Sequence, residues 1–83
     1  KVDGWDVKIN KKKIYYLEKK FKSNNFMESQ NFINKVGLIA EKENHHPDIS
    51  FGWGYSIIAI TTHAIEGLSE NDFILAAKID QIT

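Results

Sequence analysis

The chain has 83 residues, no cysteine and a formal net charge of zero. This length fits one small domain, and the lack of cysteine excludes disulfides, thiolate catalysis and zinc–thiolate sites. No apolar run approaches the roughly 18 residues that a membrane span requires, so we expect no membrane association. A small domain without crosslinks is often stabilised by association with further copies, so we expect a homo-oligomer.

The charge is spread unevenly along the chain. Residues 1–22 carry eight lysines and three carboxylates, whereas residues 23–83 carry three lysines and eight carboxylates. The sequence contains no arginine, the side chain on which bidentate recognition of phosphates and bases depends. The composition therefore argues against a sequence-specific nucleic-acid binder, and the run Lys11-Lys12-Lys13 is interpreted as a solvated turn.

The first part of the chain predicts a β-hairpin. Apolar and polar residues alternate from Trp5 to Ile9, which is typical of a half-buried strand. Residues 10–13 are polar and turn-like, and residues 14–21 are rich in β-branched and aromatic side chains. This second stretch predicts a strand that pairs with the first.

A helix is predicted next. Asn25 and Glu28 have the spacing of a capping box, and the residues that follow place an apolar face on one side of a helix. The helix should run to about Glu43, because Pro47 disfavours helical backbone at the residue before it.

The second half repeats this order. Residues 49–53 alternate and residues 56–62 are strongly β-prone, which predicts either one long strand or a second hairpin. We favour the hairpin, with a tight turn at Gly54-Tyr55, because glycine is tolerated at a turn and weakens the middle of a strand. Ser69 and Asp72 form a second capping box that opens a helix to the C-terminus. The order β-β-α-β-β-α predicts one α+β domain over residues 1–83, with a four-stranded antiparallel sheet and helices packed on one face.

All three histidines fall in one short stretch of the sequence. His45 and His46 stand directly before the only proline, and His63 follows in a Thr-Thr-His run. Adjacent histidines cannot share one face of a regular strand, but on an irregular segment after a helix they can fan around a small ligand. Because histidine titrates near neutral pH, three of them beside Glu41 and Asp72 suggest proton-transfer chemistry.

Other interpretations of these residues stay open. Each histidine could be a packing or surface residue, and the five side chains together could supply zinc ligands, although the chain has no HExxH motif. Asp72 could serve only as the N3 residue of a capping box, and Glu41 could be an exposed helix-end residue. Trp53 could lie in the core or form a pocket wall on which a flat ligand stacks.

The sequence resembles the pterin-4a-carbinolamine dehydratases over essentially its whole length. The resemblance rests on Glu41, His45-His46-Pro47, Trp53, His63 and Asp72 in this order and spacing. Surrounding positions agree: Gly4-Trp5, Ala40-Glu41-Lys42, Thr62-His63, Gly67-Leu68-Ser69 and Leu75-Ala76. Several unusual residues that match in order are a far more specific signal than an isolated His-His-Pro.

The resemblance implies the same four-stranded α+β fold and an activity. The reaction would be dehydration of 4a-hydroxytetrahydropterin to quinonoid dihydropterin, which recycles the cofactor of aromatic amino acid hydroxylases. It implies that His45 and His63 act as acid and base beside the departing hydroxyl, and that His46 grips the pterin and takes the N5 proton. The implied substrate-binding residues are Glu41, Asn44, Trp53, Thr62 and Asp72, with Glu41 and Asp72 orienting imidazoles or holding the shape of the site.

The resemblance also implies a partner set. We expect a small-molecule pterin substrate, no metal or other cofactor, no nucleic acid, no membrane and a homodimer or homotetramer in the cytoplasm. Family members usually carry a further helical segment before the position of Gly4-Trp5, which bears on the quaternary contacts. The chain begins with Lys1, which is compatible with a removed targeting segment. The alternative is a non-catalytic dimerising partner protein of the same fold, and the intact set of three histidines favours the enzyme.

Overall fold

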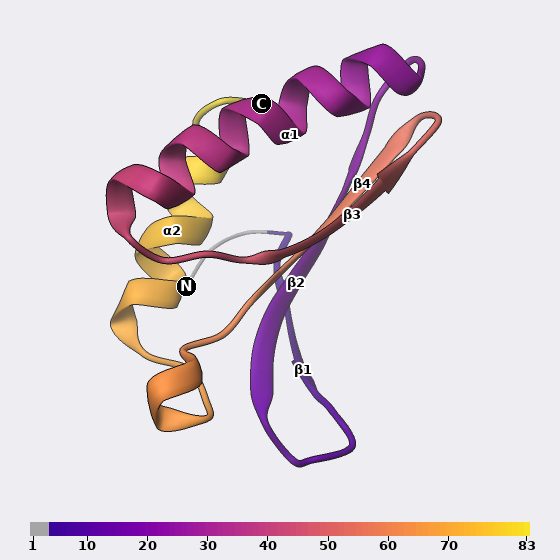
Figure 1. The fold of residues 1–83 in the computed structure, drawn as a ribbon. Helices are drawn as coiled ribbons and strands as arrows, with labels where there is room; N and C mark the ends of the chain where they lie inside the picture. The colour runs from indigo at the N-terminus through magenta and orange to yellow at the C-terminus, as the bar shows by residue number, and fades with distance from the viewer. Residues whose placement is uncertain (1–3) are drawn as a thin grey trace.

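The computed structural model describes residues 4–83, which form a four-stranded antiparallel sheet with its helices on one face (Figure 1). The strands lie in the order β1-β2-β4-β3. The elements are β1 (Asp6–Ile9), β2 (Tyr15–Lys22), α1 (Phe26–Glu43), β3 (Asp48–Gly52), β4 (Tyr55–Ile60), the short 3-10 helix η1 (His63–Ile65) and α2 (Glu70–Asp80). The predicted α+β class and the predicted order are confirmed.

Local chemistry sets both ends of α1. The Asn25 side chain accepts from the backbone N–H of Glu28 at 2.8 Å, and the Glu28 carboxylate accepts from the backbone N–H of Asn24 at 3.0 Å. At the other end Asn44 adopts a left-handed conformation with φ of 50° and donates to the carbonyls of Ala40 and Glu41. Asparagine tolerates this conformation better than most residues, so the chain turns off the helix immediately before the two adjacent histidines.

The core lies between the helices and one face of the sheet. Leu17 on β2 and Ile58 and Ile60 on β4 supply the sheet side, and all three are essentially inaccessible to solvent. The helices cover them with fully buried residues, which are Val36 on α1 and Leu75, Ala76 and Ile79 on α2. This contact stabilises the sheet and fixes where each helix end lies relative to the strands.

Several boundaries differ from the prediction, and three of the differences lie in the second half of the chain. The second hairpin turns at Trp53-Gly54 rather than Gly54-Tyr55, because Gly54 takes the left-handed position with φ of 81° and Tyr55 already pairs with Gly52. Strand β4 ends at Ile60, and Thr62 forms a separate bridge with Gly67. Helix α2 ends at Asp80, short of the C-terminus.

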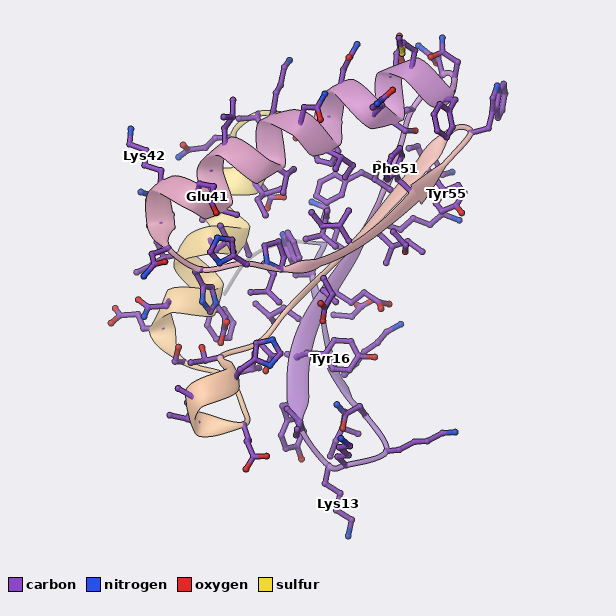
Figure 2. All side chains as sticks on the ribbon, viewed as in Figure 1. Lys13, Tyr16, Glu41, Lys42, Phe51 and Tyr55 are labelled. Atoms are coloured by element: carbon purple, nitrogen blue, oxygen red, sulfur yellow. The ribbon has the colours of Figure 1, made fainter. Side chains whose placement is uncertain are left out.

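The other face of the sheet carries no helix among residues 4–83. Side chains alternate along a strand, so this open face presents Tyr16 and Glu18 of β2, Ile57 and Ala59 of β4, and Asp48 of β3. Tyr16, labelled in Figure 2, projects on this side, away from the helices. No helix among the described residues is long and apolar enough to cross a membrane.

Candidate active site

His45 and His46 lie on the irregular segment that joins the end of α1 to the start of β3. The backbone N–H of His45 still donates to the carbonyl of Ala40 at 3.1 Å, which holds this segment against the last turn of the helix. Pro47 follows and Asp48 opens β3. The two histidines therefore lie outside regular structure, as predicted, and are free to point in different directions.

A buried carboxylate on α2 holds His45. The side chain of Asp72 is 0% exposed, and its Oδ1 lies 2.6 Å from Nε2 of His45. Its Oδ2 accepts from the backbone N–H of Ser69 at 2.7 Å and from the Thr62 hydroxyl at 2.9 Å. Because Thr62 directly precedes His63, this one carboxylate joins the segment of His45 to the segment of His63.

The same carboxylate also caps α2. Asp72 is the N3 residue of the predicted capping box with Ser69, and the bond from the Ser69 N–H confirms this half of the prediction. The Ser69 hydroxyl lies 2.6 Å from the Thr62 hydroxyl. A carboxylate only accepts hydrogen bonds, so His45 donates from Nε2 and leaves Nδ1 as its second ring nitrogen. Full burial of Asp72 favours a positioning role over direct contact with a substrate.

His46 pairs with a different carboxylate. Its Nε2 forms a close hydrogen bond with Oε2 of Glu41, a residue of the last turns of α1 that is labelled in Figure 2. The side chains of His46 and Glu41 are 57% and 77% exposed, so solvent screens this pair. Such a pair orients the imidazole without removing it from solvent or from a ligand.

His63 begins η1, and its side chain is exposed. Within residues 4–83 its imidazole makes no hydrogen bond or ion pair. It lines a cavity of about 380 Å³ whose wall also includes Tyr16, Asp48, Ala59 and Glu66. This volume lies within the range of about 300–1,000 Å³ that is typical of small-molecule sites.

The cavity reaches the other histidines only indirectly. Neither His45 nor His46 forms part of its wall, but Asp48 does, and Asp48 stands two residues after His46. The candidate site thus consists of two carboxylate-paired imidazoles on one segment and one unpaired imidazole on the next. In the part of the chain that the structure describes, no three His, Cys, Asp or Glu side chains are grouped so that they could hold a metal ion.

Two expected site residues lie apart from this arrangement. Trp53 is 72% exposed in the turn between β3 and β4, which excludes the core, one of the two places considered for it. All five residues of β3 separate it from the His46 side of the sheet, about 16 Å at ~3.3 Å per residue, so this chain does not bring it to the histidines. Asn44 lies next to His45 and is exposed, and it forms the C-cap of α1.

Sequence reasoning missed the sheet side of the cavity. Tyr16, Asp48 and Ala59 come from three strands, and only the pairing register brings them together. The available signal in the sequence was Ala59, the smallest side chain of β4.

Comparison with known proteins adds to this geometry. A family model described as pterin 4 alpha carbinolamine dehydratase matches residues 1–82. A relative from Rubrobacter xylanophilus, named "Putative pterin-4-alpha-carbinolamine dehydratase", is 47% identical over 79 residues, which are 95% of this chain and 70% of the relative. A relative of the same name from Halorhodospira halophila is 48% identical over 81 residues, which are 98% of this chain and 72% of the relative. Another from Rickettsia bellii is 54% identical over 65 residues, which are 78% of this chain and 58% of the relative.

Solved structures agree on the fold. The crystal structure of a transcriptional coactivator/pterin dehydratase from Brucella melitensis superposes with a TM-score of 0.84 at 29% identity, covering 96% of this chain and 82% of that one. A pterin dehydratase-like protein described as a RuBisCO assembly factor in the alpha-carboxysome superposes with a TM-score of 0.78 at 21% identity, covering 95% and 88%, which supports the fold alone. Because the family model and the relatives match nearly the whole chain, the chain belongs to the pterin 4 alpha carbinolamine dehydratase family.

Proposed function

We propose that this protein dehydrates 4a-hydroxytetrahydropterin to quinonoid dihydropterin by general acid–base catalysis. One observation carries the proposal: the buried carboxylate of Asp72 binds His45 and the Thr62 hydroxyl together, and so joins two histidine-bearing segments. A carboxylate with no solvent exposure that holds an imidazole is typical of a histidine whose orientation matters. The product would return to the pterin pool that serves aromatic amino acid hydroxylation.

The reaction needs one proton delivered and one removed. As the bond between C4a and its hydroxyl breaks, the hydroxyl takes a proton and leaves as water. The N5 proton is withdrawn, and the electron pair of N5 forms the C4a=N5 double bond. No electrons are gained or lost overall, so a positioned acid and a positioned base are sufficient, each contributing about 10²–10⁴-fold.

The three imidazoles differ in ways that suit these steps. His45 commits Nε2 to Asp72 and so offers Nδ1 to the substrate, while His63 has no partner in the described part of the chain and lines the cavity. We assign these two to the acid and base beside the departing hydroxyl. His46, exposed and oriented by Glu41, is assigned to the N5 proton.

The alternative is a non-catalytic partner protein of the same fold. The name of the Brucella melitensis protein joins a coactivator and a pterin dehydratase. A scaffold would not require a buried carboxylate paired with an imidazole, so the Asp72 network favours the enzyme. The two functions differ in a measurable way, because only the enzyme accelerates dehydration.

A stopped-flow assay tests the proposal. Synthetic 4a-hydroxytetrahydropterin is mixed with the purified chain, and formation of quinonoid dihydropterin is followed by absorbance. We expect the rate to rise in proportion to protein concentration above the uncatalysed rate. Ser50→Ala, on the open face and outside the cavity wall, is the matched control and should behave as wild type. A wild-type rate equal to that of buffer would reject the proposed function.

A further inference from the structure

One small side chain, Ala59, lies in the wall of the cavity beside His63. Ala59 lies on the open face of β4, where its neighbours in the sheet are Glu18 on β2 and Asp48 on β3. The corresponding position two residues earlier on β4 is Ile57, which does not line the cavity. A larger side chain at position 59 would reduce this space, so the small residue contributes to the hollow.

The two carboxylates beside Ala59 differ in their hydrogen-bond partners. Glu18 accepts from Nζ of Lys8 at 2.6 Å, and this hydrogen bond with the attraction between the two charges raises the pKa of Lys8 above its ordinary value. Glu18 does not line the cavity. Asp48 does, and within residues 4–83 its carboxylate makes no hydrogen bond or ion pair. The cavity therefore holds an acceptor that is available to a ligand.

The remaining wall suits a flat ring. Ile14, Ile60 and the ring of Tyr16 give apolar surface to the wall, and Ala59 adds little bulk to it. Asn10, Lys12 and Thr61 complete its polar part. Aromatic and aliphatic surfaces of this kind bury heteroaromatic ligands, while a few polar groups fix their orientation. A pterin carries two adjacent donors on its pyrimidine ring, N3–H and the 2-amino group. Their spacing matches the two oxygens of a carboxylate, as in a guanidinium–carboxylate pair.

We propose that Asp48 is a specificity-determining residue that binds the N3–H and 2-amino edge of the pterin in this cavity, with the ring lying over Ala59. The position of Asp48 supports this role, because it is the first residue of β3 and pairs with Ala59 in the sheet. The other carboxylate of the wall, Glu66, instead ends η1 with a left-handed backbone conformation. The assignment rests on the proposed function, since it names how the same site selects its substrate.

A double-mutant cycle between the protein and the ligand tests the proposal. Titration calorimetry measures the Kd of 7,8-dihydropterin and of the analogue with hydrogen in place of the 2-amino group, for wild type and for Asp48→Asn. Asparagine keeps the size but turns an NH₂ donor toward the donors of the ligand. We expect Asp48→Asn to raise the Kd of dihydropterin by about tenfold, because one hydrogen bond to a charged group is lost. The Kd of the analogue should change by less than about twofold.

Three further variants keep the test independent of folding. Glu66→Gln removes the other unpaired carboxylate of the wall and should leave the preference for the 2-amino group intact. Ala59→Val should weaken the binding of both ligands, because it adds bulk to the cavity wall. Ser50→Val places the same valine side chain on the open face outside the cavity and should leave binding unchanged. Thermal melts of each variant confirm that it is folded.

The outcomes separate the two levels of the proposal. The role of Asp48 would be overturned if Asp48→Asn weakened the binding of both ligands equally, or if Glu66→Gln lost the preference for the 2-amino group instead. In either case wild type would still bind dihydropterin and turn over the substrate, so the proposed function would stand. Wild type that neither binds dihydropterin nor accelerates dehydration would overturn the proposed function and this role with it.

Discussion

Asp72→Asn separates the hydrogen bond with His45 from the shape of the site. The amide oxygen can take the place of Oδ2, which accepts from the Ser69 N–H and the Thr62 hydroxyl. The amide NH₂ then faces Nε2 of His45, where Oδ1 lies at 2.6 Å in the wild-type chain. Since NH₂ donates, Nε2 must become an acceptor and the ring proton must move to Nδ1. The nitrogen that His45 offers to the substrate is then protonated.

The structure sets the size of both effects. Loss of a buried hydrogen bond to a charged group costs about 1–3 kcal/mol of unfolding free energy, and in a domain of this size each 1 kcal/mol lowers Tm by about 4–8 °C. The Tm of Asp72→Asn should therefore fall by roughly 4–24 °C. Reversal of the His45 tautomer removes one acid–base group, so the dehydration rate should fall by about 10²–10⁴-fold.

Urea unfolding and stopped-flow dehydration measure the two effects on the same protein. Ser69→Ala is the matched control, because it removes the hydroxyl of the capping residue without touching His45; it should lose about 0.5–2 kcal/mol of stability and keep a near-normal rate. If Asp72→Asn unfolds more readily but turns over at the wild-type rate, Asp72 only caps α2 and the reasoning on His45 is refuted.

Four further results are expected. His46→Ala should lose most activity with an unchanged circular dichroism spectrum, because the side chain is exposed and contributes little to the core; full activity would remove His46 from the mechanism. Glu41→Gln should change the unfolding free energy by less than about 0.5 kcal/mol, since the pair with His46 is screened by solvent, and a larger loss in urea unfolding would contradict this. Exhaustive chelation should leave turnover unchanged, because the proposed steps transfer only protons; a loss that added zinc restores would contradict them. Ser56→Ala should leave Tm unchanged or raise it, because the buried Ser56 hydroxyl has no hydrogen-bond partner among the described residues, and a clear fall in Tm would show that this hydroxyl is satisfied.

The features that the sequence predicted correctly depend on local chemistry. The first capping pattern begins with Asn25, whose side chain bonds the backbone of Glu28, and Asp72 bonds the backbone of Ser69, so in each case the pattern and its partner lie within three residues. Pro47 likewise acts on the residue before it. The order of elements and the irregular setting of the adjacent histidines follow from such signals.

The features that it missed depend on contacts between distant segments. Strand β4 ends early where the Thr61 hydroxyl bonds the carbonyls of Tyr15, 46 residues away, and of Gly67. The sequence leaves both the core and a pocket wall open for Trp53, and the hairpin register places it in an exposed turn. The second role of Asp72, as the partner of His45 across 27 residues, is also invisible to a local pattern.

The most direct test of the account is a single-turnover measurement with protein in excess over 4a-hydroxytetrahydropterin. Wild type is compared with the variant in which His45, His46 and His63 are all replaced by alanine, after circular dichroism shows that the variant is folded. The account predicts that wild type accelerates dehydration and that the triple variant returns to the uncatalysed rate. A folded triple variant that dehydrates the substrate as fast as wild type would contradict it.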